Sequence, residues 1–310
     1  MALDRTSPTD PRDDLAPVGM LEKITVLEEG VIRVLAPNSS PMTLDGTNTY
    51  VVFGRNGSCV MVDPGPRDAS HLGDVLGVIE AHDLTPRGIV LTHHHLDHAD
   101  AAGDWSQLFD VPIYAQSYGT GSAMTAVLND GDEINLDGDS VVAKFTPGHS
   151  ADHLCFSLPS GKLLTGDHVL GRGTSVVAYP DGDLEKYLWS LVKISRLPIV
   201  GIYPGHGPEL DESCASSVVR YYLEHRIRRI HQILAAFGDV PVSLADVVRI
   251  IYGERIAGDL LFAADLSTRA AVAMLVRLGY LKESLGHDQF LKCSSGFPDF
   301  SQLALDHPDA

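Results

Sequence analysis

The first two-thirds of the chain alternates short apolar runs with turn residues. Runs rich in β-branched residues predict strands over 31–35, 48–54, 59–65, 88–92, 111–115 and 198–205. Apolar residues at helical spacing predict helices over 69–83, 98–108 and 183–196. Asp130-Gly131 and Asp137-Gly138 are turn signals between further strands. Strand runs punctuated by helices favour two sheets packed face to face with helices outside.

After Asp211 the periodicity becomes almost entirely helical. One long helix is expected over 214–237, Ser243 is expected to cap a second, and Ser267 a third that Gly279 would end. The segment YLKESLGHDQFLKC is typical of two strands joined at Leu285-Gly286. Three helices followed by a hairpin is the order of a winged helix. The predicted units are a tail over 1–18, a catalytic domain over 19–213, a connecting helix over 214–237 and a winged-helix-like accessory domain over 238–310.

Composition narrows the class of protein. The hydrophobic content of 44% with 21% charged residues is ordinary for a soluble globular chain of 310 residues. Residues 1–18 are acidic and proline-rich, unlike a signal or transit peptide, so a disordered tail and a cytoplasmic location are expected. The four cysteines are far apart in the sequence, which favours reduced thiols over a disulfide framework. The net charge of -18 opposes nonspecific attraction to nucleic acid or anionic membrane.

The stretch LTHHHLDHAD, residues 91–100, carries the strongest chemical signal. His93, His95, Asp97 and His98 form an H-x-H-x-D-H pattern. Alternate side chains of an extended loop point the same way, so His93 and His95 can bind one ion while His94 points elsewhere and is expected to be structural. Asp97 and His98 come where the loop turns into a helix, and there they can reach a second ion.

One segment cannot complete two coordination spheres, because a catalytic zinc takes three protein ligands and keeps an open position. The chain offers His149 in TPGHS, Asp167 in TGDHV and His206 in YPGHG, each at a strand end beside glycine. Glycine there lets the backbone turn sharply and bring the ligand close to the metal. Five imidazoles and two carboxylates suit two divalent ions, most simply Zn²⁺, with Mn²⁺ or Fe²⁺ as alternatives.

The ordered set HHHLDH, PGHS, TGDH and PGHG resembles the metallo-β-lactamase superfamily of binuclear metallohydrolases. This resemblance implies a four-layer αββα sandwich, followed here by the small winged-helix domain, and a metal-bridging hydroxide as nucleophile. By the superfamily pattern the first metal would be held by His93, His95 and His149, the second by Asp97, His98 and His206, with Asp167 as the bridge. Asp97 and Asp167 are therefore expected to serve in catalysis as well as in metal binding.

Other stretches resemble one branch of that superfamily. This branch contains the mitochondrial β-lactamase-like endoribonuclease and its bacterial relatives. The stretches that resemble it are GTNTY (46–50), VDPG (62–65), TPGHSADH (146–153), GRGTSV (171–176) and HRIRRIHQIL (225–234). The resemblance favours Asp63 as a hydrogen-bond partner for the far nitrogen of a metal-bound histidine. His153 is either such a partner or a core histidine. Weaker expectations place Asn48, Thr49, Tyr50 and His168 near the substrate, while His71 and His82 read as surface residues without a function.

Four functions remain open at this point. The leading one is a binuclear zinc hydrolase acting on a small thioester, ester or lactone. Its rivals are a single-strand-specific endoribonuclease or phosphodiesterase, a mononuclear iron persulfide dioxygenase that leaves His98 and His206 without a metal, and a winged-helix nucleic-acid-binding regulator. A small-molecule substrate is expected, with single-stranded RNA as the alternative, no membrane partner, and a homodimer as an option.

The cationic groups favour the small-molecule version. Arg220, Arg226, Arg228 and Arg229 lie on the long helix expected over 214–237. They could form a phosphate track, but a solvated helix face paired with nearby acids is the simpler interpretation. The presumed recognition helix of the winged domain offers only Arg269 and Arg277, fewer polar groups than base reading requires.

Overall fold

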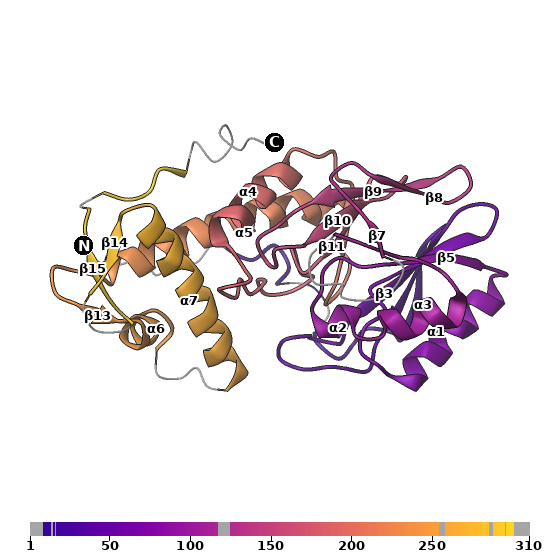
Figure 1. Cartoon of the computed structure of the whole chain (residues 1–310), viewed down its shortest axis with the longest axis horizontal. Coiled ribbons are helices and arrows are strands. Elements are labelled where there is room, and N and C mark those ends of the chain that lie inside the picture. The colour runs from indigo at the N-terminus through magenta and orange to yellow at the C-terminus, as the bar shows by residue number, and fades with distance from the viewer. Residues whose placement is uncertain are drawn as a thin grey trace.

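Two β-sheets form the centre of the structure (Figure 1). This computed structural model describes residues 9–116, 125–253, 258–284, 288–294 and 296–300, apart from 14 and 16. The first sheet has seven strands in chain order: β1 (Ile24–Glu28), β2 (Val31–Leu35), β3 (Asn48–Phe53), β4 (Ser58–Val62), β5 (Thr85–Val90), β6 (Ile113–Ala115) and β7 (Thr125–Val127). The second has the order β12-β11-β10-β9-β8, formed by β8 (Glu133–Asn135), β9 (Ser140–Phe145), β10 (Leu154–Ser157), β11 (Lys162–Gly166) and β12 (Gly201–Pro204).

Apolar side chains from both sheets meet in one buried layer. Tyr50, Val62, Phe156 and Leu164 belong to it and are at most 3% exposed. The outer face of the first sheet is covered by α1 (Ala69–Ala81) and α3 (Ala102–Phe109), and that of the second by α4 (Leu184–Ser195) and α5 (Glu212–Ala235). Burial of apolar surface on both faces of each sheet is the main stabilising contribution. The expected αββα sandwich is confirmed.

The C-terminal part packs against α4 and α5 (Figure 1). It contains α6 (Leu244–Tyr252), α7 (Asp259–Arg277) and a sheet of β13 (Val242–Ser243), β15 (Gln289–Lys292) and β14 (Leu281–Glu283), in that order. Ser243 caps α6 as predicted, since its hydroxyl accepts from the Asp246 amide. Gly279, at φ +76°, follows the end of α7 as expected. The turn predicted at Leu285-Gly286 lies outside the described residues.

The prediction that Ser267 caps the third helix is wrong. Helix α7 begins at Asp259 after Gly258, so Ser267 lies in its interior. No glycine or proline interrupts residues 259–277, and the helix therefore continues two turns further towards the N-terminus than its apolar spacing indicated. The single helix expected over 98–108 is likewise two, α2 (Leu96–Ala99) and α3, and strand β1 was not foreseen.

The prediction of a disordered tail over 1–18 is wrong at Arg12, because the side chain of this residue is buried. Its guanidinium pairs with Asp10 and donates to the carbonyls of Leu170 and Gly173. A charge-based pattern misses this contact because the partners are main-chain oxygens far along the chain. None of the described helices is long and apolar enough to cross a membrane.

The prediction that the arginines of α5 lie on a solvated face is also wrong at Arg226, because this residue is only 6% exposed. Its guanidinium carbon lies 5.1 Å from the ring centroid of Tyr187 on α4, and Nη2 donates to the Ser175 carbonyl. The packing of α5 on α4 therefore encloses this arginine, whereas Arg220 of the same helix is exposed.

Candidate metal centre

Five strands that run in the same direction end at one edge of the sandwich. Residues that follow β4, β5, β9, β11 and β12 meet there, because β4–β5 and β11–β12 are parallel pairs and β9 is two antiparallel steps from β11. The amide of Asn48 donates to the Gly205 carbonyl and joins the two sheets at this edge. A Cβ at Gly205 would lie 2.7 Å from Asp167 Oδ1 and 2.8 Å from His98 Cε1, so only glycine permits this close approach.

Three imidazoles converge at this edge. Nδ1 of His95 lies 3.0 Å from Nε2 of His93 and 3.0 Å from Nε2 of His149. Two ligands at the metal–nitrogen distance of zinc, in tetrahedral geometry, are separated by about 3.3 Å. The spacing of these three nitrogens is therefore that of ligands around a common ion.

A second group forms beside the first. Nε2 of His98 lies 3.2 Å from Nε2 of His206. Asp97 Oδ2 lies 3.2 Å from Nε2 of His206 and 3.7 Å from Nε2 of His98. The side chains of His98 and His206 are fully buried, while that of Asp97 is a third exposed. These atoms lie within the mutual distance that one metal ion requires.

Asp167 lies between the two groups. Its Oδ1 is 3.3 Å from Nε2 of His98 and 3.4 Å from Nε2 of His206, while its Oδ2 is 3.6 Å from Nε2 of His149. One carboxylate thus presents a different oxygen to each group. The structure brings together all seven residues expected as ligands, and the nitrogen and carboxylate donors fit divalent ions of borderline softness.

The charges of the cluster suit a cation. Burial lowers the pKa of His93 well below its usual value and that of His149 to about 4, which keeps both rings neutral with lone pairs available. Burial also acts against protonation of His98 and His206, but the Asp167 and Asp97 carboxylates outweigh it and raise both pKa values. Against its own burial, Asp97 has its pKa lowered to about 2 by His98 and His206, so it is ionised.

Asp63 supports His98 from behind. Its Oδ2 lies 2.8 Å from Nδ1 of His98 and accepts from the Thr92 hydroxyl, while Oδ1 accepts from the Thr92 amide. This is the far-nitrogen contact expected from the sequence. Such a carboxylate fixes the tautomer and orientation of a metal-binding ring.

Replacement of Asp63 by asparagine is expected to weaken divalent-metal binding by about 10–100-fold. Asp63 has φ +53°, a conformation that asparagine tolerates, so the backbone keeps its path while His98 loses the anionic partner of Nδ1. Competition for Zn²⁺ with a chromophoric chelator measures the change. Unaltered affinity would show that His98 is oriented without Asp63.

His153 and His168 are buried beside the metal ligands. His153 is fully buried, with Nδ1 3.0 Å from the Thr146 hydroxyl and its ring 5.2 Å from that of His93. His168 is also fully buried, and its ring packs 4.6 Å from that of Tyr187. His168, expected near the substrate, thus packs against α4 and has no exposed surface.

Asn48, Thr49 and Tyr50, expected near the substrate, are at most 3% exposed. The Asn48 amide nitrogen donates to the carbonyls of Pro204 and Gly207, and the Tyr50 hydroxyl donates to that of Pro204. Asn48 and Tyr50 therefore hold the loop that carries His206, while the Thr49 hydroxyl donates to the Asp63 carbonyl. His71, expected at the surface, is fully buried with Nε2 2.8 Å from the Thr49 hydroxyl.

The rim of the site includes two acids that sequence reasoning did not single out. Asp152 Oδ1 lies 2.8 Å from Nδ1 of His94, and Asp181 Oδ2 lies 3.4 Å from Nε2 of His95. Nδ1 of His149 lies 2.7 Å from the Val176 carbonyl and 3.1 Å from the Ser175 hydroxyl. Asp152 is within the TPGHSADH stretch and Ser175 within the GRGTSV stretch, so both could have been found there, but Asp181 is in no motif that marks it.

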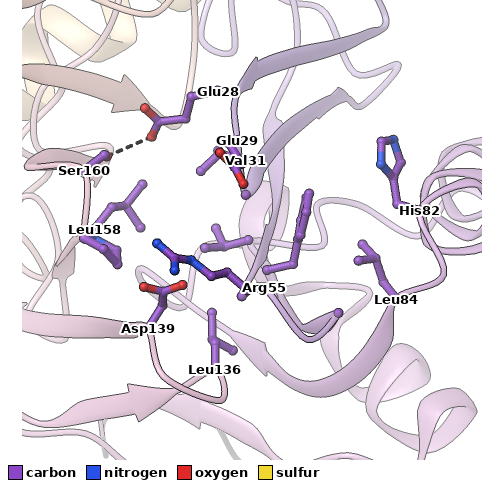
Figure 2. Close-up of a pocket in the computed structure, with 16 residues that line it drawn as sticks. Glu28, Glu29, Val31, Arg55, His82, Leu84, Leu136, Asp139, Leu158 and Ser160 are labelled. Atoms are coloured by element: carbon purple, nitrogen blue, oxygen red, sulfur yellow. Dashed lines mark hydrogen bonds between the residues drawn. The ribbon is translucent and has the colours of Figure 1, made fainter.

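A cavity of about 420 Å³ lies at the other end of the sandwich (Figure 2). Glu28, Arg55 and Asp139 line it, and Ser160 donates to Glu28 across 2.8 Å. None of the seven clustered ligands borders this cavity. The chemistry of the protein is therefore assigned from the donor cluster and not from the volume of this cavity.

An αββα sandwich that gathers imidazoles and carboxylates at one edge defines a metal-binding, metal-dependent hydrolase. Residues 42–206 match the sequence model of the metallo-beta-lactamase superfamily, and the chain belongs to this superfamily. A beta-lactamase-like protein 2 homolog from Drosophila melanogaster is 32% identical over 292 residues, which cover 88% of this chain and 96% of that protein.

Two further similarities mark the range of relatives. An atrochrysone carboxyl ACP thioesterase from Aspergillus fumigatus is 34% identical, with 71% of this chain and 69% of that protein covered. The crystal structure of a beta-lactamase domain protein from Burkholderia ambifaria matches with a TM-score of 0.77 at 19% identity and covers 91% of this chain and 96% of that one. At such low identity the structural likeness shows the fold alone.

Proposed function

We propose that the protein is a binuclear zinc hydrolase that acts on a small thioester, ester or lactone. The observation that carries the proposal is the position of Asp167, whose two oxygens face different groups of imidazoles. A mononuclear iron dioxygenase would leave His98, His206 and Asp97 without a metal, although their ligand atoms lie close enough to share one.

In this proposal two divalent ions, when bound, supply Lewis acidity and activated water near neutral pH. The chain's own residues hold and orient the site. His93, His95 and His149 serve one ion, and Asp97, His98 and His206 the other. Asp63 fixes the His98 ring, and Val176 and Ser175 fix that of His149. The exposed rim formed by His95 and Asp97 is the side from which a substrate carbonyl would approach.

Charge and pairing support a small acyl substrate over RNA. The chain carries a net charge of -18, which repels polyanions. On α7, Arg269 pairs with Asp265 and Asp288, and Arg277 pairs with Glu185 and Asp183, so neither side chain is left for phosphate contacts. The similarity to an ACP thioesterase also supports a thioester. We further propose that α6, α7 and β13–β15 form a winged-helix-like accessory domain that closes one side of the pocket.

The purified protein is expected to bind about two Zn²⁺ per chain and to hydrolyse a thioester, aryl ester or lactone faster than bis-p-nitrophenyl phosphate or single-stranded RNA. Metal analysis and one panel of these five substrates measure both quantities. Preferential cleavage of RNA would replace the proposal with an endoribonuclease. About one iron and no zinc would replace it with the dioxygenase.

A further inference from the structure

A second pocket, of about 240 Å³, adjoins the metal centre. One wall is the segment 174–176, between β11 and α4, and the others come from α5, the end of α6 and α7. Figure 1 shows α5 leading from the sandwich to the C-terminal part, with α7 crossing below it. Arg226 and Arg229 of α5 line this pocket beside Leu260 and Ala264 of α7. We call it the α5–α7 pocket.

Arg226 has one buried hydrogen-bond donor, Nε, that is not used by the described residues. It is 94% buried, Nη2 donates to the Ser175 carbonyl, and the guanidinium face lies over the Tyr187 ring. Within the described part of the chain Nε has no hydrogen-bond partner, and no carboxylate forms an ion pair with this residue. A buried charge without an opposite charge is unfavourable, so the arrangement indicates an anion that completes it.

Arg229, which is half-buried, also lies over an aromatic ring. Its guanidinium carbon lies 4.5 Å from the ring centroid of Tyr252, and the ion pairs of the described residues do not include it. Stacking on an aromatic ring orients a guanidinium while leaving its in-plane N–H groups free for a carboxylate or phosphate.

The described arginines of α6 and α7 differ from Arg226 and Arg229 in their ion pairs. Arg249, Arg269 and Arg277 each pair with one or more carboxylates. The chain has 41 acidic against 23 basic residues, so acids for pairing are abundant. The described lining of the α5–α7 pocket nevertheless contains no acid.

The neighbouring electrostatics are positive and the remaining lining is apolar. Burial, followed by the charges of Arg226 and Arg229, lowers the pKa of His225 to about 4, so this lining residue stays neutral. Leu184 and Ile230 lie on the sandwich side of the pocket and Leu260 on the α7 side. The ligand that fits both properties is an oxyanion carried on an apolar arm.

We propose that the α5–α7 pocket binds the anionic end of the substrate, a carboxylate or phosphate attached through an apolar arm to the bond that is hydrolysed. This assignment rests on the proposed hydrolase function and narrows its substrate class. A volume of about 240 Å³ is below the ~300–1,000 Å³ that encloses a whole drug-sized ligand. The pocket therefore holds one end of a molecule whose reacting group lies elsewhere.

The metal centre is the neighbour that the reacting group would reach. Ser175 and Val176 form part of the pocket wall and also contact Nδ1 of His149. The same segment thus separates the guanidinium of Arg226 from a metal ligand. The pocket therefore lies on the Nδ1 side of the His149 ring, and the apolar arm would pass around this segment to bring the carbonyl to the metals.

The test uses the zinc-loaded full chain and two pairs of thioesters. One pair is octanoyl-N-acetylcysteamine and its ω-carboxylate analogue, and the other is octanoyl-pantetheine and octanoyl-4′-phosphopantetheine. The wild type is expected to prefer the anionic member of one pair, which identifies carboxylate or phosphate as the source. In Arg229→Gln, kcat/KM for that member is expected to fall about 10–100-fold, as loss of charged hydrogen bonds predicts, while the neutral member changes less than about twofold.

Arg228→Gln is the matched control, because it removes the same charge from the same helix and Arg228 does not line the pocket. Arg229→Lys should recover part of the preference. Equal losses for the neutral and anionic thioesters, or an equal effect of Arg228→Gln, would overturn the assignment.

Calorimetric titration with suberate and with 4′-phosphopantetheine separates this assignment from the proposed function. Binding of one anion that weakens in Arg229→Gln but not in Arg228→Gln supports the pocket even where no thioester is hydrolysed, and only the hydrolase substrate class then fails. Hydrolysis without any Arg229-dependent binding or anion preference leaves the hydrolase intact and overturns the pocket.

Discussion

Replacement of Asp167 by asparagine is expected to lower kcat/KM by more than about 10³-fold, beyond the 10–100-fold cost of losing a partner behind a metal ligand. The change removes one of the two carboxylates in the cluster. It also removes a group whose Oδ1 lies 3.3 Å from His98 Nε2 and whose Oδ2 lies 3.6 Å from His149 Nε2. Metal analysis should show fewer ions per chain, and steady-state kinetics on the best panel substrate measure the loss.

Asp83→Asn is the control for this substitution. Asp83 follows α1, is exposed and has φ +52°, a conformation that asparagine tolerates, so the control removes the same charge away from the cluster. It should retain wild-type activity and metal content. Full activity and full metal content in Asp167→Asn would contradict a bridging role.

The members of the metal cluster could be predicted from the sequence because a local sequence pattern identifies each ligand. His149, Asp167 and His206 each follow a strand and stand beside a glycine, and the parallel pairing of β11 with β12 then brings Asp167 and His206 to one edge. The carboxyl ends of parallel strands meet at the same edge of a sheet, so local signals suffice for a site of this kind.

Roles that depend on packing could not be predicted in this way. Asn48 and Tyr50 lie near the site in the sequence pattern, but only the contact of β3 with the His206 loop shows that the Asn48 amide nitrogen and the Tyr50 hydroxyl donate to carbonyls of that loop. From the sequence, Arg226 is indistinguishable from the other arginines of the same helix. The structure shows that Tyr187 of α4 packs against it. The 3.6-residue period of a helix gives the angular spacing of these side chains but not the element that covers them.

The start of α7 shows the same limit at the level of secondary structure. Ser267 is a good capping residue by type, yet the residues before it continue the helix back to Gly258. A capping residue is favourable only where the preceding chain leaves the helix, which a tertiary contact can decide.

The second large effect concerns stability and comes from Gly148. This residue precedes the metal ligand His149 and has φ +136°, and a Cβ there would lie 2.3 Å from both Cα and N of Tyr187 at the start of α4. The obstructing atoms are backbone, so no side-chain rotation relieves the contact. Its carbonyl also accepts from the amide of Asp183, the N-cap of α4, at 2.9 Å.

Gly148→Ala is therefore expected to lower the free energy of unfolding by about 3–5 kcal/mol, the sum of an overpacking cost and of a non-glycine residue in a sparsely populated conformation. Zinc content should fall as well, because the substitution displaces His149 from His95. Urea denaturation followed by tryptophan fluorescence measures the first quantity, and metal analysis of the folded protein measures the second.

Gly77→Ala gives the opposite expectation and serves as the control. Gly77 lies in the interior of α1, is exposed, and would place a Cβ with no atom within 4 Å. Since alanine favours a helix over glycine by about 1 kcal/mol, this variant should be slightly more stable than the wild type. Equal stability of the two variants would show that the chain around Gly148 relaxes without cost, and the close packing of α4 on the His149 turn would then not be what positions that ligand.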